Sequence, residues 1–132
     1  MSLDPARPPA PNRPSVLFVC TANQIRSPMA AALFRVRLMM TEPDWRKWRV
    51  DSAGTWATPG RPAAIEAQHV IARRGLDLTT HRSRLVSYDL LRRFRLILVM
   101  ERGHKESILA EFPTLADRVY LLSEMSGEQT PI

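Results

Sequence analysis

One cysteine, followed after five residues by an arginine and a serine, has the spacing of a site for nucleophilic chemistry on an anion. The stretch VLFVCTANQIRSPMAAALF, residues 16 to 34, contains Cys20, the only cysteine among the 132 residues. Arg26 and Ser27 follow it. A loop of five residues can turn successive backbone N–H groups inward around an anion. The helical pattern after Ser27 adds the positive end of a helix dipole at the same place. A tetrahedral oxyanion such as phosphate fits this description.

Each of the three side chains has a distinct chemical task. Inward N–H groups, the helix N-terminus and Arg26 all favour the thiolate form of Cys20, which is the nucleophilic form. Arg26 offers a planar fork of donors that can hold two phosphoryl oxygens. Ser27 can donate a hydrogen bond to the sulfur, which helps it leave when water cleaves a thiophosphate. We therefore predict Cys20, Arg26 and Ser27 as catalytic residues.

The residues around the thiol decide between a catalytic and a structural cysteine. A lone cysteine after a buried strand is most often a small apolar residue. The asparagine, arginine, serine and proline at these spacings favour the catalytic interpretation, and Asn23 tolerates the positive φ that a tight bend needs. The predicted phosphate-binding residues of the loop are Thr21, Ala22, Asn23, Gln24, Ile25 and Arg26.

Strands and helices alternate along the chain. Residues 16–19 form an apolar run without polar alternation, typical of a central strand buried on both faces. Ser27 and Pro28 are typical of a helix N-cap and first helical residue. Further strands are predicted at 48–54, 95–100 and 118–122, and helices at 62–75, at 87–93 with Ser87 as the residue that caps its start, and at about 103–112. The residues after 122 have no apolar periodicity, so no regular structure is predicted there. This order predicts an α/β fold, a four-stranded parallel sheet with helices on both faces and a phosphate-binding loop after the first strand.

The two ends of the chain differ in composition. Residues 1–14, MSLDPARPPAPNRP, are rich in proline and poor in large apolar side chains, and we predict a disordered tail. Residues 15–132 fit one domain. No apolar run approaches the roughly 20 residues of a spanning helix, so no membrane contact is expected. A single cysteine and an N-terminus without a secretory signal favour the cytoplasm.

The chain is basic, with a formal charge of +6 from 19 basic and 13 acidic residues. Such a balance suits either a polyanion or a smaller phosphorylated substrate. The stretch RKWR, residues 46–49, is the one place where an aromatic side chain lies among basic ones. Because Trp48 and Val50 alternate as in a strand, we favour a structural role there and expect no nucleic acid partner.

The stretch FVCTANQIRSPMAAALF resembles the phosphate loop of the low-molecular-weight protein tyrosine phosphatases, whose signature is Cys, five residues, Arg and Ser, usually followed by Pro. The similarity continues through DSAGT (51–55), HRSR (81–84) and LILVME (96–101). The resemblance implies a phosphatase domain over 15–132 that acts on phosphorylated proteins through a phosphocysteine, without metal or cofactor. It also implies a supporting hydrogen-bond network of Asn23, Ser52 and His81 behind the loop.

The resemblance leaves the substrate open. Gln24 brings an amide to the position where the family lines its pocket entrance, and relatives of this fold dephosphorylate either phosphotyrosine or phosphoarginine. Trp56 is predicted as an aromatic wall for a substrate ring, with a core anchor as the alternative. His69 and His104 have no metal-ligand spacing with each other or with Cys20, so we expect both to be structural or solvated.

The general acid of the family, an Asp followed by Pro after the fourth strand, has no counterpart in the sequence. The Asp-Pro pair Asp4–Pro5 stands in the predicted tail. We expect the acid loop and the last helix to be absent from the sequence, with Glu124 and Glu128 as weak substitutes. Two alternatives therefore stay open, a phosphate-dependent binding module with little turnover and an arsenate reductase, although no cysteine after Cys20 could relay oxidation. We expect a monomer.

Overall fold

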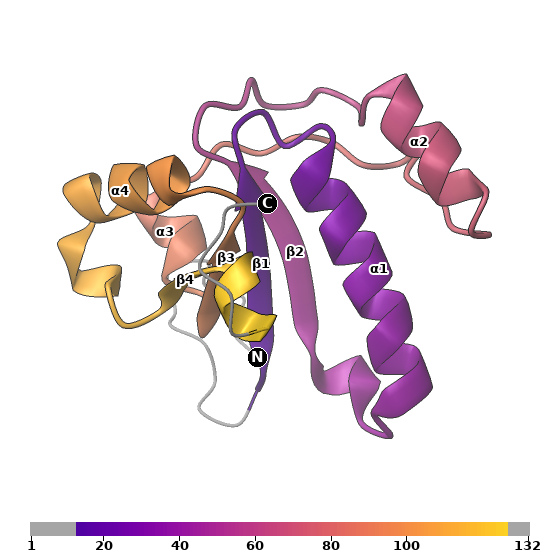
Figure 1. The fold of residues 1–132 in the computed structure, drawn as a ribbon, viewed down its shortest axis with the longest axis horizontal. Helices are drawn as coiled ribbons and strands as arrows, with labels where there is room; N and C mark the ends of the chain where they lie inside the picture. The colour runs from indigo at the N-terminus through magenta and orange to yellow at the C-terminus, as the bar shows by residue number, and fades with distance from the viewer. Residues whose placement is uncertain (1–12, 127–132) are drawn as a thin grey trace, which may run out of the picture.

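A computed structural model describes residues 13–126 and contains a four-stranded parallel sheet (Figure 1). The strands are β1 (Ser15–Cys20), β2 (Arg49–Gly54), β3 (Leu96–Val99) and β4 (Val119–Leu121), in the spatial order β2-β1-β3-β4. All three neighbouring pairs are parallel. β1 is a central strand, and all six of its residues are buried. Both the strand order and the burial agree with the apolar run at 16–19.

Helices cover both faces of this sheet. They are α1 (Arg26–Thr41), α2 (Ile65–Ala72), α3 (Tyr88–Leu91) and α4 (Arg102–Glu111), with 3-10 turns η1 (Trp45–Lys47), η2 (Pro113–Leu115) and η3 (Leu122–Ser126). In Figure 1, α1 lies on one side of the sheet and α3 and α4 lie on the other, while α2 lies beyond the N-terminal end of α1. The predicted fold class is confirmed.

The two faces of β1 belong to different apolar clusters, because successive residues of a strand point to opposite faces. One cluster contains Leu17, Val19, Phe94 and Ile108, and the other contains Val16, Phe18, Cys20, Ala31 and Leu38. The second cluster is the one that includes α1. Cys20 therefore points to the face under α1, at the carboxyl end of a strand that cannot shift without exposing both clusters.

The predicted N-cap of the first helix is wrong. α1 begins at Arg26 and its N-cap residue is Ile25, which makes no side-chain capping bond. Ser27 lies inside the first turn and is completely buried. Its hydroxyl forms hydrogen bonds with Cys20 and Asn23 and not with the helix backbone. The serine that the local pattern predicted as a helix cap therefore stabilises the phosphate loop.

Other boundaries differ by a few residues for tertiary reasons. α2 begins at Ile65, not at residue 62, because Ala64 is extended and its N–H donates to the Gln24 carbonyl at 2.8 Å. Gly75 ends the turn after α2 with φ of +77°, which favours glycine. The predicted cap at Ser87 is confirmed, since its hydroxyl accepts from the Leu90 N–H at 3.1 Å.

The ends of the chain add two observations. The predicted tail lies outside the described residues except for Arg13 and Pro14, and the Pro14 carbonyl accepts from the Arg49 N–H at the start of β2. After β4, where no regular structure was expected, η3 forms and the Glu124 carboxylate accepts from the Leu121 N–H at 2.8 Å. In the described part of the chain, no helix is long and apolar enough to cross a membrane.

Candidate active site

The loop between β1 and α1 encloses a hollow of about 250 Å³. Its lining consists of Cys20, Thr21, Ala22, Gln24, Ile25, Arg26 and Ala64. The hollow lies at the carboxyl end of β1, where ligands bind in open parallel sheets. Of the predicted phosphate-binding residues, only Asn23 and Trp56 do not line it, and Asn23 lies beneath it.

Asn23 holds the loop from inside. Its φ is +59°, in the left-handed region, and the residue is completely buried. Its amide nitrogen donates to the Ser27 hydroxyl at 2.8 Å and to the Ser52 hydroxyl at 2.9 Å. Its amide oxygen accepts from the Arg84 N–H at 2.9 Å. With each polar group partnered, this side chain fixes the bend in one conformation, because breaking any bond would leave a buried group unpaired.

His81 closes this network from a distant segment. Its Nε2 lies 2.7 Å from the Asn23 backbone oxygen, and a carbonyl oxygen only accepts, so Nε2 carries the proton. Burial is the main cause that lowers the pKa of His81, and the positive charges of Arg84, Arg35 and Arg82 add to it, against the hydrogen bond to Asn23. The structure thus brings Asn23, Ser52 and His81 into hydrogen-bond contact.

The Ser27 hydroxyl can follow the charge on the sulfur. Its oxygen lies 2.9 Å from Cys20 Sγ, accepts from Asn23 and lies 3.3 Å from the Ala53 carbonyl oxygen. The hydroxyl has a single hydrogen. When Cys20 is a thiol, the S–H donates to Ser27 and the Ser27 hydrogen goes to Ala53. When Cys20 is a thiolate, the same hydrogen turns to the sulfur, so a hydrogen bond stabilises the charge without any movement of the backbone.

The extension of β2 supports the back of the loop. The Cys20 and Thr21 carbonyls accept from the N–H groups of Thr55 and Trp56 at 2.9 and 3.0 Å. Gly54 makes this approach possible, because a Cβ there would lie 2.3 Å from the Thr21 carbonyl oxygen. The Trp56 side chain itself is 82% exposed and is not in the lining of the hollow. Its role as a substrate wall stays a prediction.

Arg26 lies at the rim and meets a carboxylate that the sequence did not single out. Its Nη1 lies 3.1 Å from Glu101 Oε2, and both side chains are more than one third exposed. Glu101 lies two residues after the end of β3, so the carboxyl ends of β1 and β3 bring the two residues together across 75 positions. Glu101 could have been recognised from the sequence as a carboxylate just after a predicted parallel strand, because the carboxyl ends of such strands meet at the ligand site.

His104 is a second residue that sequence reasoning did not assign to the site. It is 5% exposed, and its Nε2 lies 2.8 Å from the Thr21 hydroxyl. The spacing Glu101-x-x-His104 matches an N-cap and its third helical residue, which is the capping-box position. His69 is exposed on α2, away from the hollow.

Of the two proposed acid substitutes, Glu124 is described by the structure, and it does not line the hollow. Glu124 lines a separate pocket with Arg102, Lys105 and Glu106, and its carboxylate accepts from the Leu121 backbone N–H. Glu128 and the Asp4–Pro5 pair lie outside the described residues. Among residues 13–126, no group of three or more His, Cys, Asp or Glu side chains is placed to hold a metal ion.

A thiol under an oxyanion loop, with an arginine at its rim and a serine hydroxyl on the sulfur, defines the class of cysteine-dependent phosphatases. The family model described as low molecular weight phosphotyrosine protein phosphatase matches residues 15–130. The chain belongs to this family, whose members are cysteine-dependent hydrolases.

Two relatives and one structure show the range of the family. The chain is 38% identical over 111 residues to the probable low molecular weight protein-tyrosine-phosphatase EpsP of Ralstonia nicotianae, covering 84% of this chain and 72% of the relative. It is 34% identical over 109 residues to a protein-arginine-phosphatase of Geobacillus stearothermophilus, covering 83% and 69%. A cysteine-to-serine mutant of the arginine phosphatase YwlE, with a phosphorylated active-site serine, superposes with a TM-score of 0.83 at 30% identity, covering 89% of this chain and 75% of that one.

Proposed function

We propose that this phosphatase removes the phosphoryl group from tyrosine side chains of proteins, with Cys20 as nucleophile, Arg26 as phosphate clamp and Ser27 as support for the thiolate. The observation that carries the proposal is the 2.9 Å contact of Cys20 Sγ with the Ser27 hydroxyl, beneath a hollow with Arg26 in its lining. The buried hydrogen bonds of Asn23 to Ser27 and Ser52 hold this geometry through protein contacts alone, which is the preorganisation that catalysis requires.

The first chemical step transfers the phosphoryl group to sulfur. Cys20 Sγ attacks phosphorus, the S–P bond forms, and the P–O bond to the leaving group breaks. The leaving oxygen takes up a proton from an acid or from water. The Arg26 guanidinium, which pairs with Glu101 at 3.1 Å, turns part of its donor fork to the phosphoryl oxygens. The exposed ion pair opposes this little, because such pairs are worth about 0–1 kcal/mol.

The second step hydrolyses the phosphocysteine. Water attacks phosphorus, the S–P bond breaks, inorganic phosphate forms, and the sulfur leaves as a thiolate. The Ser27 hydrogen then turns from the Ala53 carbonyl to the sulfur. The phosphorylated serine of the YwlE mutant supports a covalent intermediate at the corresponding side chain.

The rim determines which phosphorylated side chain can enter. Gln24 donates from its amide nitrogen to the Pro62 carbonyl at 3.1 Å, so its amide oxygen remains for a polar ligand. An exposed Trp56 at the edge of the loop supports an aromatic substrate. Phosphoarginine is the second candidate, favoured by the Gln24 amide and by the 34% identity to a protein-arginine-phosphatase.

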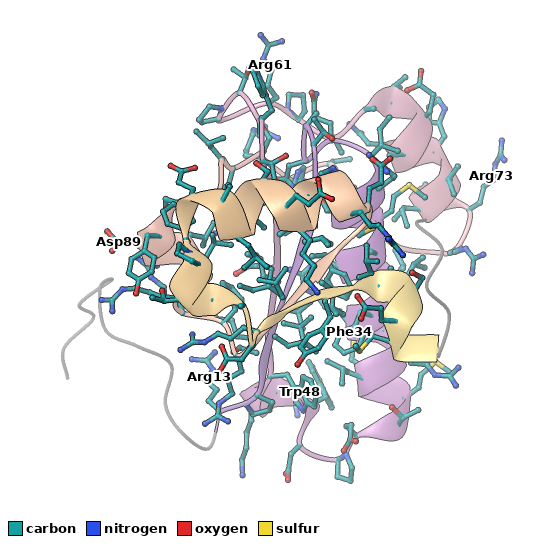
Figure 2. All side chains as sticks on the ribbon, turned by 60° about the vertical axis from the view of Figure 1, so that its left-hand side comes forward. Arg13, Phe34, Trp48, Arg61, Arg73 and Asp89 are labelled. Carbon is teal, nitrogen blue, oxygen red and sulfur yellow. The ribbon has the colours of Figure 1, made fainter. Side chains whose placement is uncertain are left out.

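The setting of the reaction is part of the proposal. We place the phosphatase domain at residues 15–132 after a tail at 1–14, as a cytoplasmic monomer that binds no nucleic acid. The buried, free thiol of Cys20 supports a reducing compartment. Trp48 packs against Phe34, in the middle of α1, with ring centroids 5.9 Å apart, and both side chains are labelled in Figure 2. This contact supports a structural role for RKWR.

The test is the Cys20→Ser variant of the full chain with phosphotyrosine and phosphoarginine peptides. The wild-type chain should release phosphate, and the variant should lose turnover by at least about 10³-fold while it still binds the peptide. The faster of the two peptides identifies the substrate class. Binding without any turnover by the wild type would instead identify a phosphate-dependent binding module, and turnover that survives in the variant would exclude Cys20 as the nucleophile.

A further inference from the structure

We propose that His104 is a positioning residue that holds Thr21, the first residue of the phosphate loop, in its reactive conformation. The proposal rests on the phosphatase function of the loop. The two residues are 83 positions apart, yet His104 Nε2 lies 2.8 Å from Thr21 Oγ1. His104 is 5% exposed, so water does not compete for this contact.

The hydrogen bonds of His104 define its tautomer. The Glu101 backbone N–H donates to Nδ1 at 3.1 Å, and a backbone N–H can only donate, so Nδ1 carries no hydrogen. A neutral imidazole with a bare Nδ1 has its hydrogen on Nε2. His104 therefore donates to the Thr21 hydroxyl, and Thr21 keeps its own hydrogen for an acceptor in the hollow that it lines. Burial, then the charge of Arg26, lowers the pKa of His104, against Glu101, which agrees with the neutral form.

The first turn of α4 holds the imidazole from behind. Glu101 and His104 form a reciprocal capping box, in which the Glu101 side chain accepts from the His104 N–H and the His104 ring accepts from the Glu101 N–H. Rotation of the ring would therefore break the cap of a ten-residue helix. The donor to Thr21 is thus attached to a rigid element instead of to a loop.

The same helix start reaches both ends of the phosphate loop. His104 contacts Thr21, just after the nucleophile, and the Glu101 carboxylate contacts Arg26, at the other end. Asn23 holds the middle from beneath. Because the loop N–H groups must meet charge that develops in the transition state, a loosened Thr21 lowers kcat more than it raises KM.

Two variants of His104 separate its two hydrogen bonds. His104→Asn keeps an acceptor near the Glu101 N–H but does not reach Thr21, whereas His104→Gln keeps a donor at the distance of Nε2 but loses the acceptor. We expect His104→Asn to retain the melting temperature and to lower kcat roughly 2- to 10-fold, the effect of one hydrogen bond. We expect His104→Gln to lower the melting temperature and to restore most of kcat.

Coupling to Thr21 completes the test. Thr21→Val should lower kcat as His104→Asn does, and the double variant should lose no more than either single one. His69→Asn, at an exposed histidine of α2, is the matched control and should leave kcat unchanged. Inorganic vanadate should bind more weakly to His104→Asn, to Thr21→Val and to the double variant, by similar factors, and equally well to His69→Asn and the wild type. This readout does not depend on turnover.

Three results would overturn the assignment. Independent, multiplicative losses in the double variant would mean that His104 does not act through Thr21. Equal kcat for His104→Asn and the wild type, with only the melting temperature changed, would reduce His104 to a helix cap. If kcat of His104→Gln is as low as that of His104→Asn, the hydrogen bond donated to Thr21 is not what supports turnover. If the variants bind vanadate less tightly than the wild type as expected, but the wild type releases no phosphate, the proposed function is contradicted and the positioning role is still supported.

Discussion

The interior and the rim of the phosphate loop follow different physical rules. The interior consists of Asn23, Ser27 and Ser52, which are buried and bonded to one another. At the rim, the side chains of Ile25 and Trp56 are 49% and 82% exposed. A buried polar group that loses its partner costs about 1–3 kcal/mol, whereas an exposed substitution usually changes stability by less than about 0.5 kcal/mol.

This difference teaches that one short loop separates the chemistry from the choice of substrate. The interior can hold only one arrangement, because each hydroxyl and amide there needs its particular partner. The rim can vary at little cost in stability, so the same reaction can be offered to different side chains. The occurrence of both tyrosine and arginine phosphatases among the relatives fits this separation.

Arg26 is the strongest test of the comparison, because it belongs to the rim by exposure and to the chemistry by its proposed role. Arg26→Lys should lower kcat/KM on an aryl phosphate by about 10²- to 10³-fold, since an ammonium lacks the planar fork of donors that binds two phosphoryl oxygens in parallel. The melting temperature should hardly change, because the pair with Glu101 is exposed. Steady-state kinetics and calorimetry check both. The control is Arg73→Lys, at a side chain that projects from the far end of α2 (Figure 2).

Asn23→Ala tests the interior directly. The substitution removes the partners of Ser27, Ser52 and the Arg84 N–H and forces a residue with a Cβ but no amide into φ of +59°. We expect a loss of about 2–4 kcal/mol in the free energy of unfolding, measured in urea, together with a loss of turnover. Gln24→Ala, the neighbouring residue on the rim, should lose less than about 1 kcal/mol. Equal losses at the two positions would contradict the division between interior and rim.

Acid should destabilise the fold through the two histidines that contact the phosphate loop, His81 and His104. The pKa values of His81 and His104 are lowered in the folded chain, so the unfolded chain binds more protons as the pH falls below the ordinary histidine value of about 6.5. These two histidines should therefore not change the free energy of unfolding above pH 6.5, and they should lower it as the pH decreases from that value. Urea titrations between pH 7.5 and pH 5 measure the slope. His81→Gln, which keeps a donor for Asn23 but does not titrate, should reduce this slope, and His104 should account for the part that remains.

The smallest effect is expected at Trp56. Because its side chain is exposed, Trp56→Ala should change the free energy of unfolding by less than about 0.5 kcal/mol. If its ring receives an aromatic substrate, KM for a phosphotyrosine peptide should rise a few-fold, while KM for a phosphoarginine peptide stays the same. Competition between the two peptides measures the change. A rise for both peptides would mean that Trp56 supports the loop and does not select the substrate.

Local features of the sequence were sufficient for much of the fold. The apolar run of β1 indicated burial on both faces, and Ser87 was recognised as a helix cap. Such signals involve side chains and backbone groups only a few residues apart, so they can be recognised without knowing how distant segments pack. The local pattern failed at Ser27, where two plausible uses of one hydroxyl competed and the loop prevailed over the helix cap.

Contacts across the sheet could not be predicted in the same way. The partners Arg26 and Glu101 are 75 positions apart, and Thr21 and His104 are 83 positions apart. They meet because β3 lies beside β1, which places the start of α4 against the loop. No short pattern specifies which side chain a neighbouring strand delivers there, even where the capping spacing of residues 101 and 104 is visible.

The sequence by itself determined the reacting groups, because a thiol, a guanidinium and a hydroxyl at fixed spacing share one loop whose length allows little else. The tertiary structure decided how that loop is held. The hydrogen bonds of Asn23, His81 and His104 exist only after the strands have assembled, since each joins atoms that come within 3 Å of one another only in the folded chain.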